Sequence, residues 1–227
     1  GKPYVSFFST ADLLSDLGSP ENTAKAFEAM RARARAAGLP GLHIGACSSG
    51  DPRLLAELKA AGFDSVTAYN YPRAGAPTAQ SPYRSYLPGH EAIWRESDAD
   101  GTLPYIPLLT VNWDSRPWAG PRAEARFARS TADFVEGLGR LKAFLDERGR
   151  KLAILEAWNE WGEGSYLEPN AEFGFGDLEA IRATFAAPGD WPVNIGPADL
   201  GLHGKYDIRR SMPSTEPGSE LRLAGLH

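Results

Sequence analysis

Short apolar runs alternate along the chain with longer segments of helical character. The first run, residues 2–9, combines aromatic and β-branched side chains without helical spacing, which is typical of a buried strand. A capped helix is predicted next, because Ser19 is a good N-cap, Pro20 suits the first turn and Gly38 favours a left-handed stop. The pattern then recurs. The predicted strands are 2–9, 41–47, 64–69, 104–111 and 151–158, and the predicted helices are 20–37, 51–62, about 123–148 and 177–186.

This alternation predicts an α/β fold with a parallel sheet, because parallel neighbours need crossover connections. No glycine-rich phosphate fingerprint follows the first strand, which argues against a dinucleotide-binding sheet. Aromatic and acidic residues instead follow the strands, and barrels build their active sites at that end. We therefore expect a (β/α)8 TIM-type barrel of which about five βα units are visible, with the first strands missing. Residues 1–207 are assigned to this catalytic barrel and 208–227 to a coil tail.

Two connections, 70–103 and 112–122, are longer than usual and are expected to wall a pocket. The first should contain its own helix, capped at Ser81 with Pro82 next. An incomplete barrel leaves strand edges unpaired, so we expect the isolated segment to be poorly soluble or to oligomerise.

Composition narrows the possible partners. The 227 residues are 42% hydrophobic, enough for one sizeable core, and the net charge of -5 with dispersed basic residues argues against a nucleic-acid partner. No apolar run is long enough for a membrane span. The single cysteine, Cys47, excludes an internal disulfide, and no histidine or cysteine spacing suggests a metal site, so no cofactor is expected. Localisation is undetermined, with a secreted or periplasmic protein slightly favoured.

Residues 156–170, "EAWNEWGEGSYLEPN", combine four carboxylates with two tryptophans, a tyrosine and two glycines. If the preceding strand stays extended, Glu156, Trp158 and Glu160 share one face. Glycines at 162 and 164 then allow a sharp turn that folds Glu163 back beside Glu160. Two neighbouring carboxylates repel each other, and partial burial raises the pKa of at least one of them. Such a pair suits glycoside cleavage, which needs one proton donor and one nucleophile or base.

The stretch "WNEWGEG" followed by "YLEP" resembles the signature of barrel proteins related to glycoside hydrolase family 99, the endo-acting α-mannosidases and α-mannanases, and of their WbsX-like relatives, described as polysaccharide glycosyltransferases. The segments "PLLTVNWDSRPW" and "NIGPADLGLHGKYDI" are similar to this family more loosely. The resemblance implies catalysis by Glu160 and Glu163 with retention of configuration. Glu160 would deprotonate the sugar 2-hydroxyl to form a 1,2-anhydro sugar, and Glu163 would be the acid/base. Gly162 stands where family 99 usually has histidine, which places the chain nearer the WbsX-like relatives and leaves the sugar open.

Further residues are candidates for binding a glycan or polysaccharide substrate. They are Asn159, Trp158, Trp161, Tyr166, Tyr69, Tyr71, Trp113, Asp114 and Arg116. Each has a structural alternative: the aromatics can be loop packing, Asp114 and Arg116 a surface ion pair, and Glu156 the partner of an arginine or a support for the catalytic pair. A retaining hydrolase is favoured over two alternatives, a WbsX-like glycosyltransferase in polysaccharide biosynthesis and a non-catalytic carbohydrate-binding barrel.

Overall fold

The computed structural model describes residues 1–48 and 51–201 of the chain. The chain divides into two compact units, Gly1–Pro188 and Gly189–His227. In the second unit the described residues include one short 3-10 helix, η3 (Pro197–Leu200). The expected domain end at residue 207 and the expected coil tail 208–227 lie outside the described residues.

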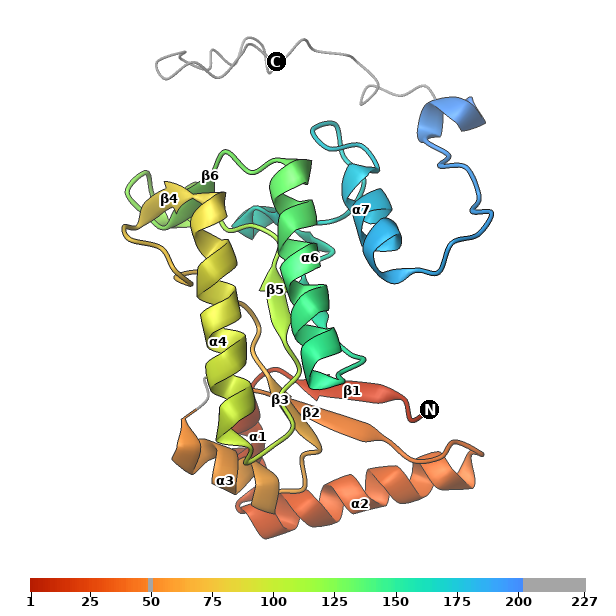
Figure 1. The fold of residues 1–227 in the computed structure, drawn as a ribbon. Helices are drawn as coiled ribbons and strands as arrows, with labels where there is room; N and C mark the ends of the chain where they lie inside the picture. The colour runs from red at the N-terminus through yellow and green to blue at the C-terminus, as the bar shows by residue number, and fades with distance from the viewer. Residues whose placement is uncertain (49–50, 202–227) are drawn as a thin grey trace, which may run out of the picture. The chain divides into compact units, whose positions relative to one another are not determined.

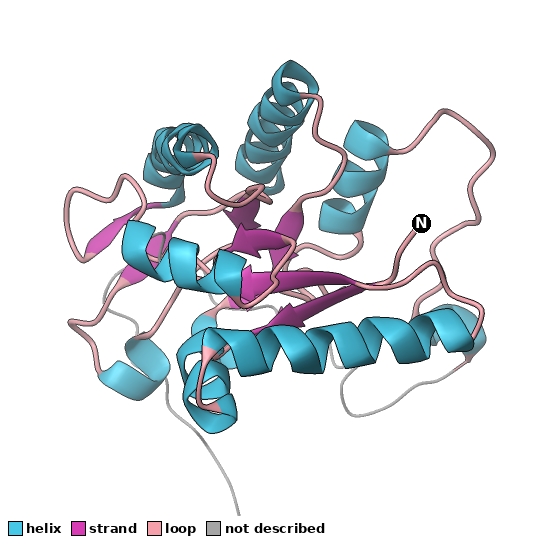
Figure 2. Cartoon of the chain, turned by 90° about the horizontal axis from the view of Figure 1, so that it is seen from below, coloured by secondary structure: helices cyan, strands magenta, loops and turns pink. Residues whose placement is uncertain are grey.

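The centre of the first unit is a run of parallel strands (Figures 1 and 2). The strands β1 (Tyr4–Phe7), β2 (His43–Cys47) and β3 (Ser65–Thr67) pair in sequence order. A parallel bridge from Val66 to Tyr105 joins β3 to the segment that leads into β5 (Leu108–Thr110), and β5 pairs in parallel with β7 (Ile154–Glu156). The mixed α/β fold and the parallel order are thus as predicted. Within the described residues these strands do not close into a ring, so the complete barrel stays a prediction.

The helices follow the strands as the alternation predicts. They are α2 (Pro20–Ala36), α3 (Pro52–Ala60), α6 (Thr131–Arg148) and α7 (Gly176–Phe185). The Ser19 hydroxyl caps α2 by accepting a hydrogen bond from the Asn22 amide at 3.2 Å. An additional helix, α1 (Thr10–Leu17), separates β1 from α2 and was not predicted. It ends at Gly18, which has a φ of 82°.

Two predicted helix starts are wrong. Ser81 does not cap a helix, because it lies in the short strand β4 (Gln80–Pro82), and α4 (Tyr86–Asp100) begins only after a 3-10 turn. The helix expected from about residue 123 begins at Thr131, because β6 (Ala125–Phe127) occupies the preceding residues and pairs with β4 in parallel. In both cases the residues at the expected helix start instead belong to a strand of the long-range β4–β6 pair. Local helix propensity could not reveal it.

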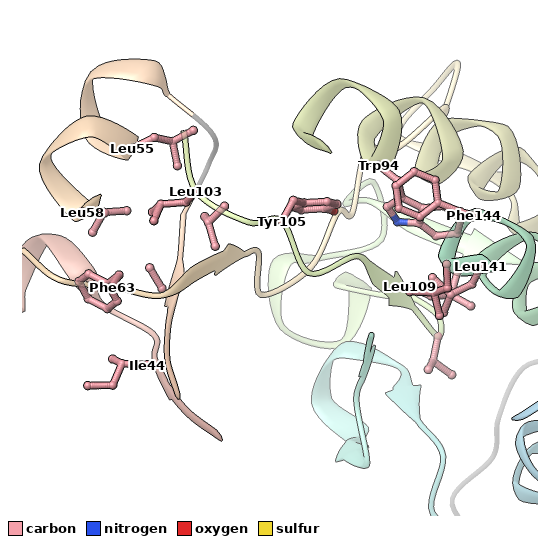
Figure 3. Close-up of a cluster of buried hydrophobic side chains, with 14 of the residues drawn as sticks. Ile44, Leu55, Leu58, Phe63, Trp94, Leu103, Tyr105, Leu109, Leu141 and Phe144 are labelled. Atoms are coloured by element: carbon pink, nitrogen blue, oxygen red, sulfur yellow. The ribbon is translucent and has the colours of Figure 1, made fainter. Parts of the chain in front are cut away.

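The hydrophobic core lies between the strands and the covering helices (Figure 3). Phe63 and Ile44 pack with the leucines of α3 at one end, and Trp94, Leu109 and Phe144 pack at the other. The Trp94 indole N–H donates to the Leu108 carbonyl at 2.7 Å, which fixes α4 against β5. Because the strands are parallel, their carboxyl ends lie at one edge of the sheet, where the predicted site residues follow.

Candidate active site

The motif 156–170 forms a tight hairpin directly after β7. The short strands β8 (Asn159–Glu160) and β9 (Ser165–Tyr166) pair antiparallel, and the 3-10 turn η2 (Trp161–Glu163) joins them. Gly164 closes the turn with a φ of 67°, in the left-handed region. A Cβ at Gly164 would lie 2.9 Å from the Asp114 Cβ, so the hairpin needs glycine there. Gly162 has no such constraint, since a Cβ at that position would meet nothing within 4 Å, and the expectation that both glycines make the turn holds only for Gly164.

The Glu163 side chain is half-buried beside the carboxyl end of β3. The Tyr69 hydroxyl donates to Glu163 Oε2 at 3.2 Å, and the Glu163 carbonyl accepts from the Asp114 amide at 2.6 Å. Burial raises the pKa of Glu163 above its ordinary value, the negative charge of Glu160 adds to this rise, and the Tyr69 hydrogen bond opposes it. This turn therefore holds a carboxyl group that retains its proton to higher pH than a free glutamate.

Glu160 is exposed, unlike Glu156, which is only 4% exposed. The expectation that Glu156, Trp158 and Glu160 share one face is wrong, because the strand ends at Glu156 and only the two later side chains reach solvent. The charge of Glu160 nevertheless raises the pKa of both other glutamates, so the three carboxyl groups form one electrostatic cluster.

Glu156 has no arginine partner among the described residues, so of its two alternatives the ion pair is not found. Its Oε2 lies 3.2 Å from the Ser165 hydroxyl, and its Oε1 is buried without a hydrogen-bond partner. Burial, followed by the charge of Glu163, raises the pKa of Glu156 to about 8, and the charge of Glu160 adds to this. The buried carboxyl therefore belongs to the same site as the two predicted acids.

The predicted aromatic residues divide into packed and exposed ones. Tyr71 packs in the loop and shares a hydrogen bond with the Tyr105 hydroxyl at 2.9 Å, and Trp113 is buried, so for these two the packing alternative describes the structure. Tyr69 contributes its hydroxyl to Glu163. Its ring lies edge-to-face with Phe8 at 5.1 Å. Phe8, which is 68% exposed directly after β1, was missed, because the predicted strand 2–9 included it.

The hairpin carries the exposed aromatic surface. Trp161 stacks on Tyr166 with centroids 4.1 Å apart, and its indole N–H donates to Glu168 at 3.0 Å. The Tyr166 hydroxyl donates to Glu172 at 3.0 Å. These bonds hold the Trp161 ring in one orientation while 47% of the residue stays exposed, and Trp158 is exposed to a similar degree. Asn159 is exposed on β8.

Asp114 and Arg116 form an ion pair with two hydrogen bonds, 2.8 Å from Nε to Oδ1 and 2.6 Å from the terminal nitrogen to Oδ2. The Arg116 side chain holds the pKa of Asp114 below its ordinary value. The ion-pair alternative is therefore present, and sugar binding by these two residues stays a prediction.

Neither a metal site nor a membrane span occurs in the described ranges 1–48 and 51–201. These ranges hold no group of three or more histidine, cysteine, aspartate or glutamate residues placed to bind a metal ion. No helix in them has the length and apolarity to cross a membrane.

Similar proteins agree with the resemblance seen in the motif. A protein of Xanthomonas campestris pv. campestris, "Uncharacterized protein WxcX", is 25% identical over 179 residues, which cover 71% of this chain and 26% of the relative. A solved "Glycoside hydrolase-like protein" superposes with a TM-score of 0.57 at 18% identity over 83% of this chain and 55% of the other. A family 99 endo-α-mannosidase from Bacteroides thetaiotaomicron gives a TM-score of 0.46 at 19% identity, over 82% of this chain and 53% of the other.

The chain thus spans about a quarter of the curated relative and about half of each solved structure. The likeness to the first of these structures shows a shared fold. The model of the family described as "Glycosyltransferase WbsX" matches residues 16–181, well over half of the sequence. The chain belongs to the WbsX glycosyltransferase family.

Proposed function

We propose that the chain carries the catalytic carboxylates of a carbohydrate-active enzyme, a retaining glycoside hydrolase that acts on a glycan or polysaccharide. Glu160 is the base and Glu163 is the acid/base. The exposed rings of Trp158 and Trp161, with Tyr166 beneath Trp161, are platforms for sugar rings. Asn159 directly precedes Glu160 in β8, and the Asp114 amide donates to the Glu163 carbonyl. In this proposal Asn159, Asp114 and Arg116 bind sugar hydroxyls.

The observation that supports this assignment most directly is the contrast between the two acids. Glu160 is exposed, whereas Glu163 is half-buried and has a raised pKa, partly because of the charge of Glu160. The raised pKa favours the protonated form of Glu163, which the acid in glycoside cleavage must have. The Tyr69 hydroxyl keeps the acid oriented.

The route follows the family resemblance, and each proton is accounted for. Glu160 takes the proton of the sugar 2-hydroxyl, whose oxygen attacks the anomeric carbon. The glycosidic bond breaks as Glu163 gives its proton to the leaving oxygen. Water then attacks the anomeric carbon of the 1,2-anhydro sugar and loses a proton to Glu163, while Glu160 returns its proton to O2. Two inversions at the same carbon give net retention.

The test uses the full-length protein and a panel of polysaccharides, with release of reducing ends as the readout. Glu163→Gln keeps the shape but cannot transfer a proton, so turnover should fall by roughly 10²–10⁴-fold while glycan affinity persists. Glu96→Gln, at an exposed site on α4, is the matched control and should retain activity. Unchanged turnover in Glu163→Gln would remove the assignment.

The second candidate is a glycosyltransferase, and the description of the family itself favours it. A transferase should be stabilised against heat by a nucleotide sugar and should extend an acceptor glycan, with no release of reducing ends. A non-catalytic carbohydrate-binding barrel should bind glycan equally well before and after Glu163→Gln and should show neither reaction.

A further inference from the structure

Glu156 is the most deeply buried carboxyl group of the hairpin region, and its surroundings determine what it can do. Its backbone carbonyl accepts two hydrogen bonds, from the Ser165 hydroxyl at 2.7 Å and from the Val111 amide at 2.6 Å. Its side-chain Oε2 lies 3.2 Å from the same Ser165 hydroxyl oxygen. Its Oε1 is buried and has no hydrogen-bond partner.

The protons available for the contacts between Glu156 and Ser165 indicate whether Glu156 is protonated or ionised. A serine hydroxyl has one proton, and the carbonyl at 2.7 Å is the closer acceptor for it. The remaining contact, between Glu156 Oε2 and Ser165 Oγ, becomes a hydrogen bond only if the carboxyl group supplies the proton. An ionised Glu156 would instead bury two charged oxygens with at most one shared donor, which is a costly arrangement.

The acidic groups that face Glu156 also favour its protonated form, whereas a hydrogen bond donated by the Ser165 hydroxyl would lower its pKa. Glu163 in η2 and Glu160 in β8 are acidic, and their charges raise the pKa of Glu156. Two tyrosines also lie near it, and the charge of Glu156 raises the pKa of both Tyr69 and Tyr86. No lysine or arginine in the described part of the chain forms an ion pair with it. Neutralisation must therefore come from a proton.

We propose that Glu156 is a positioning residue that holds a proton at neutral pH and donates it to the Ser165 hydroxyl, which anchors the catalytic hairpin on the end of β7. Ser165 lies directly opposite Glu160 in the β8–β9 pair, so the anchor acts on the strand that carries the proposed base. The proton also removes one negative charge from the cluster of three carboxyl groups. This role in positioning rests on the proposed function, whereas the proton itself is observable without substrate. The raised pKa of Glu156, about 8, agrees with it.

The test is infrared spectroscopy of the full-length protein between pH 5 and pH 10, in the carbonyl band of protonated carboxylic acids. The wild type should keep a protonated-acid band at pH 7, where ordinary carboxylates are ionised, and lose it near pH 8. Glu156→Gln should lack the component of this band that disappears near pH 8, and the control Glu96→Gln should keep it. A band that is absent at pH 7 in the wild type, or that is unchanged in Glu156→Gln, overturns the proposal.

A second variant decides the question even if Glu156→Gln fails to fold. Glu163→Gln removes the carboxylate that raises the pKa of Glu156 most after burial, so the band should disappear at a lower pH than in the wild type. Glu160→Gln should move it in the same direction by less. No shift in either variant overturns the proposal. These spectra need no turnover, so a protein without hydrolase activity that shows the band would refute the proposed reaction and leave the protonated Glu156 standing.

Discussion

Two acid-rich regions of the molecule differ in whether their carboxyl groups have cationic partners. On the outer face of α4 and α6, which lie side by side in Figure 1, Glu91, Glu136 and Glu147 are all paired with Arg95 or Arg140. The hydrogen bond from Arg95 lowers the pKa of Glu147. In the hairpin after β7, the described residues supply no cation to Glu156, Glu160 or Glu163, and the pKa of Glu156 and that of Glu163 are raised.

Burial and the presence or absence of a cation determine which role a carboxyl group can have. Paired acids on a helix surface stay ionised and improve solubility at little cost. Acids that are brought together and partly buried without countercharge reduce the stability of the fold when they ionise. A cluster of this kind at the carboxyl ends of parallel strands supports the catalytic role proposed for it. Four substitutions test whether burial and countercharge separate the two regions.

The largest effect is expected where a buried acid loses its countercharge. Arg129 and Asp177 form an ion pair at 2.7 Å, and each side chain is 3% exposed. Arg129→Met should lower the free energy of unfolding by about 3–5 kcal/mol, because it leaves the Asp177 carboxylate buried and unpaired. Urea denaturation at pH 7 measures this. The double variant Arg129→Met/Asp177→Leu should recover part of the loss, and a single variant as stable as the wild type would contradict the expectation.

The next effect tests how the hairpin is held in place. Gly164→Ala should cost roughly 1–3 kcal/mol, because alanine is strained at a positive φ and its Cβ would meet Asp114. Turnover should fall as well, since Glu163 directly precedes this residue. Gly162→Ala is the matched control, because a methyl group there enters open space. If the two variants behave alike in thermal denaturation and in turnover, the contact of Gly164 with Asp114 does not position the acid.

A smaller effect is expected at Tyr69, whose neutral hydroxyl donates a hydrogen bond to Glu163. Tyr69→Phe removes the hydroxyl that stabilises the ionised form of Glu163, so the pKa of Glu163 should rise. Under the proposed mechanism Glu163 must be protonated to act as the acid, so the alkaline limb of the pH–rate profile should move to higher pH. Tyr71→Phe is the control, because the Tyr71 hydroxyl contacts Tyr105 and no carboxylate. A limb that stays in place, or that moves to lower pH, would contradict the sign.

Part of the fold and part of the candidate site could be predicted from the sequence. The parallel strands were predictable because their apolar runs and intervening helices are local patterns, and the Glu160–Glu163 hairpin because its composition fits neither core nor loop. The burial of Glu156 depends on packing against Val111 and Ser165, and the donor role of Tyr69 depends on a contact between residues 94 positions apart. Periodicity carries no information about contacts of that kind.

The smallest effect should come from the surface network itself. Arg140 bonds Glu91 at 3.1 Å and Glu136 at 3.0 Å, but its side chain is 38% exposed, so solvent already screens both pairs. Arg140→Met should therefore cost about 0–1 kcal/mol at low salt and less at high salt, as measured by urea denaturation at two ionic strengths. A loss as large as that of Arg129→Met, and insensitive to salt, would mean that burial is not what separates the two regions. The raised pKa values of the hairpin would then need a cause other than desolvation.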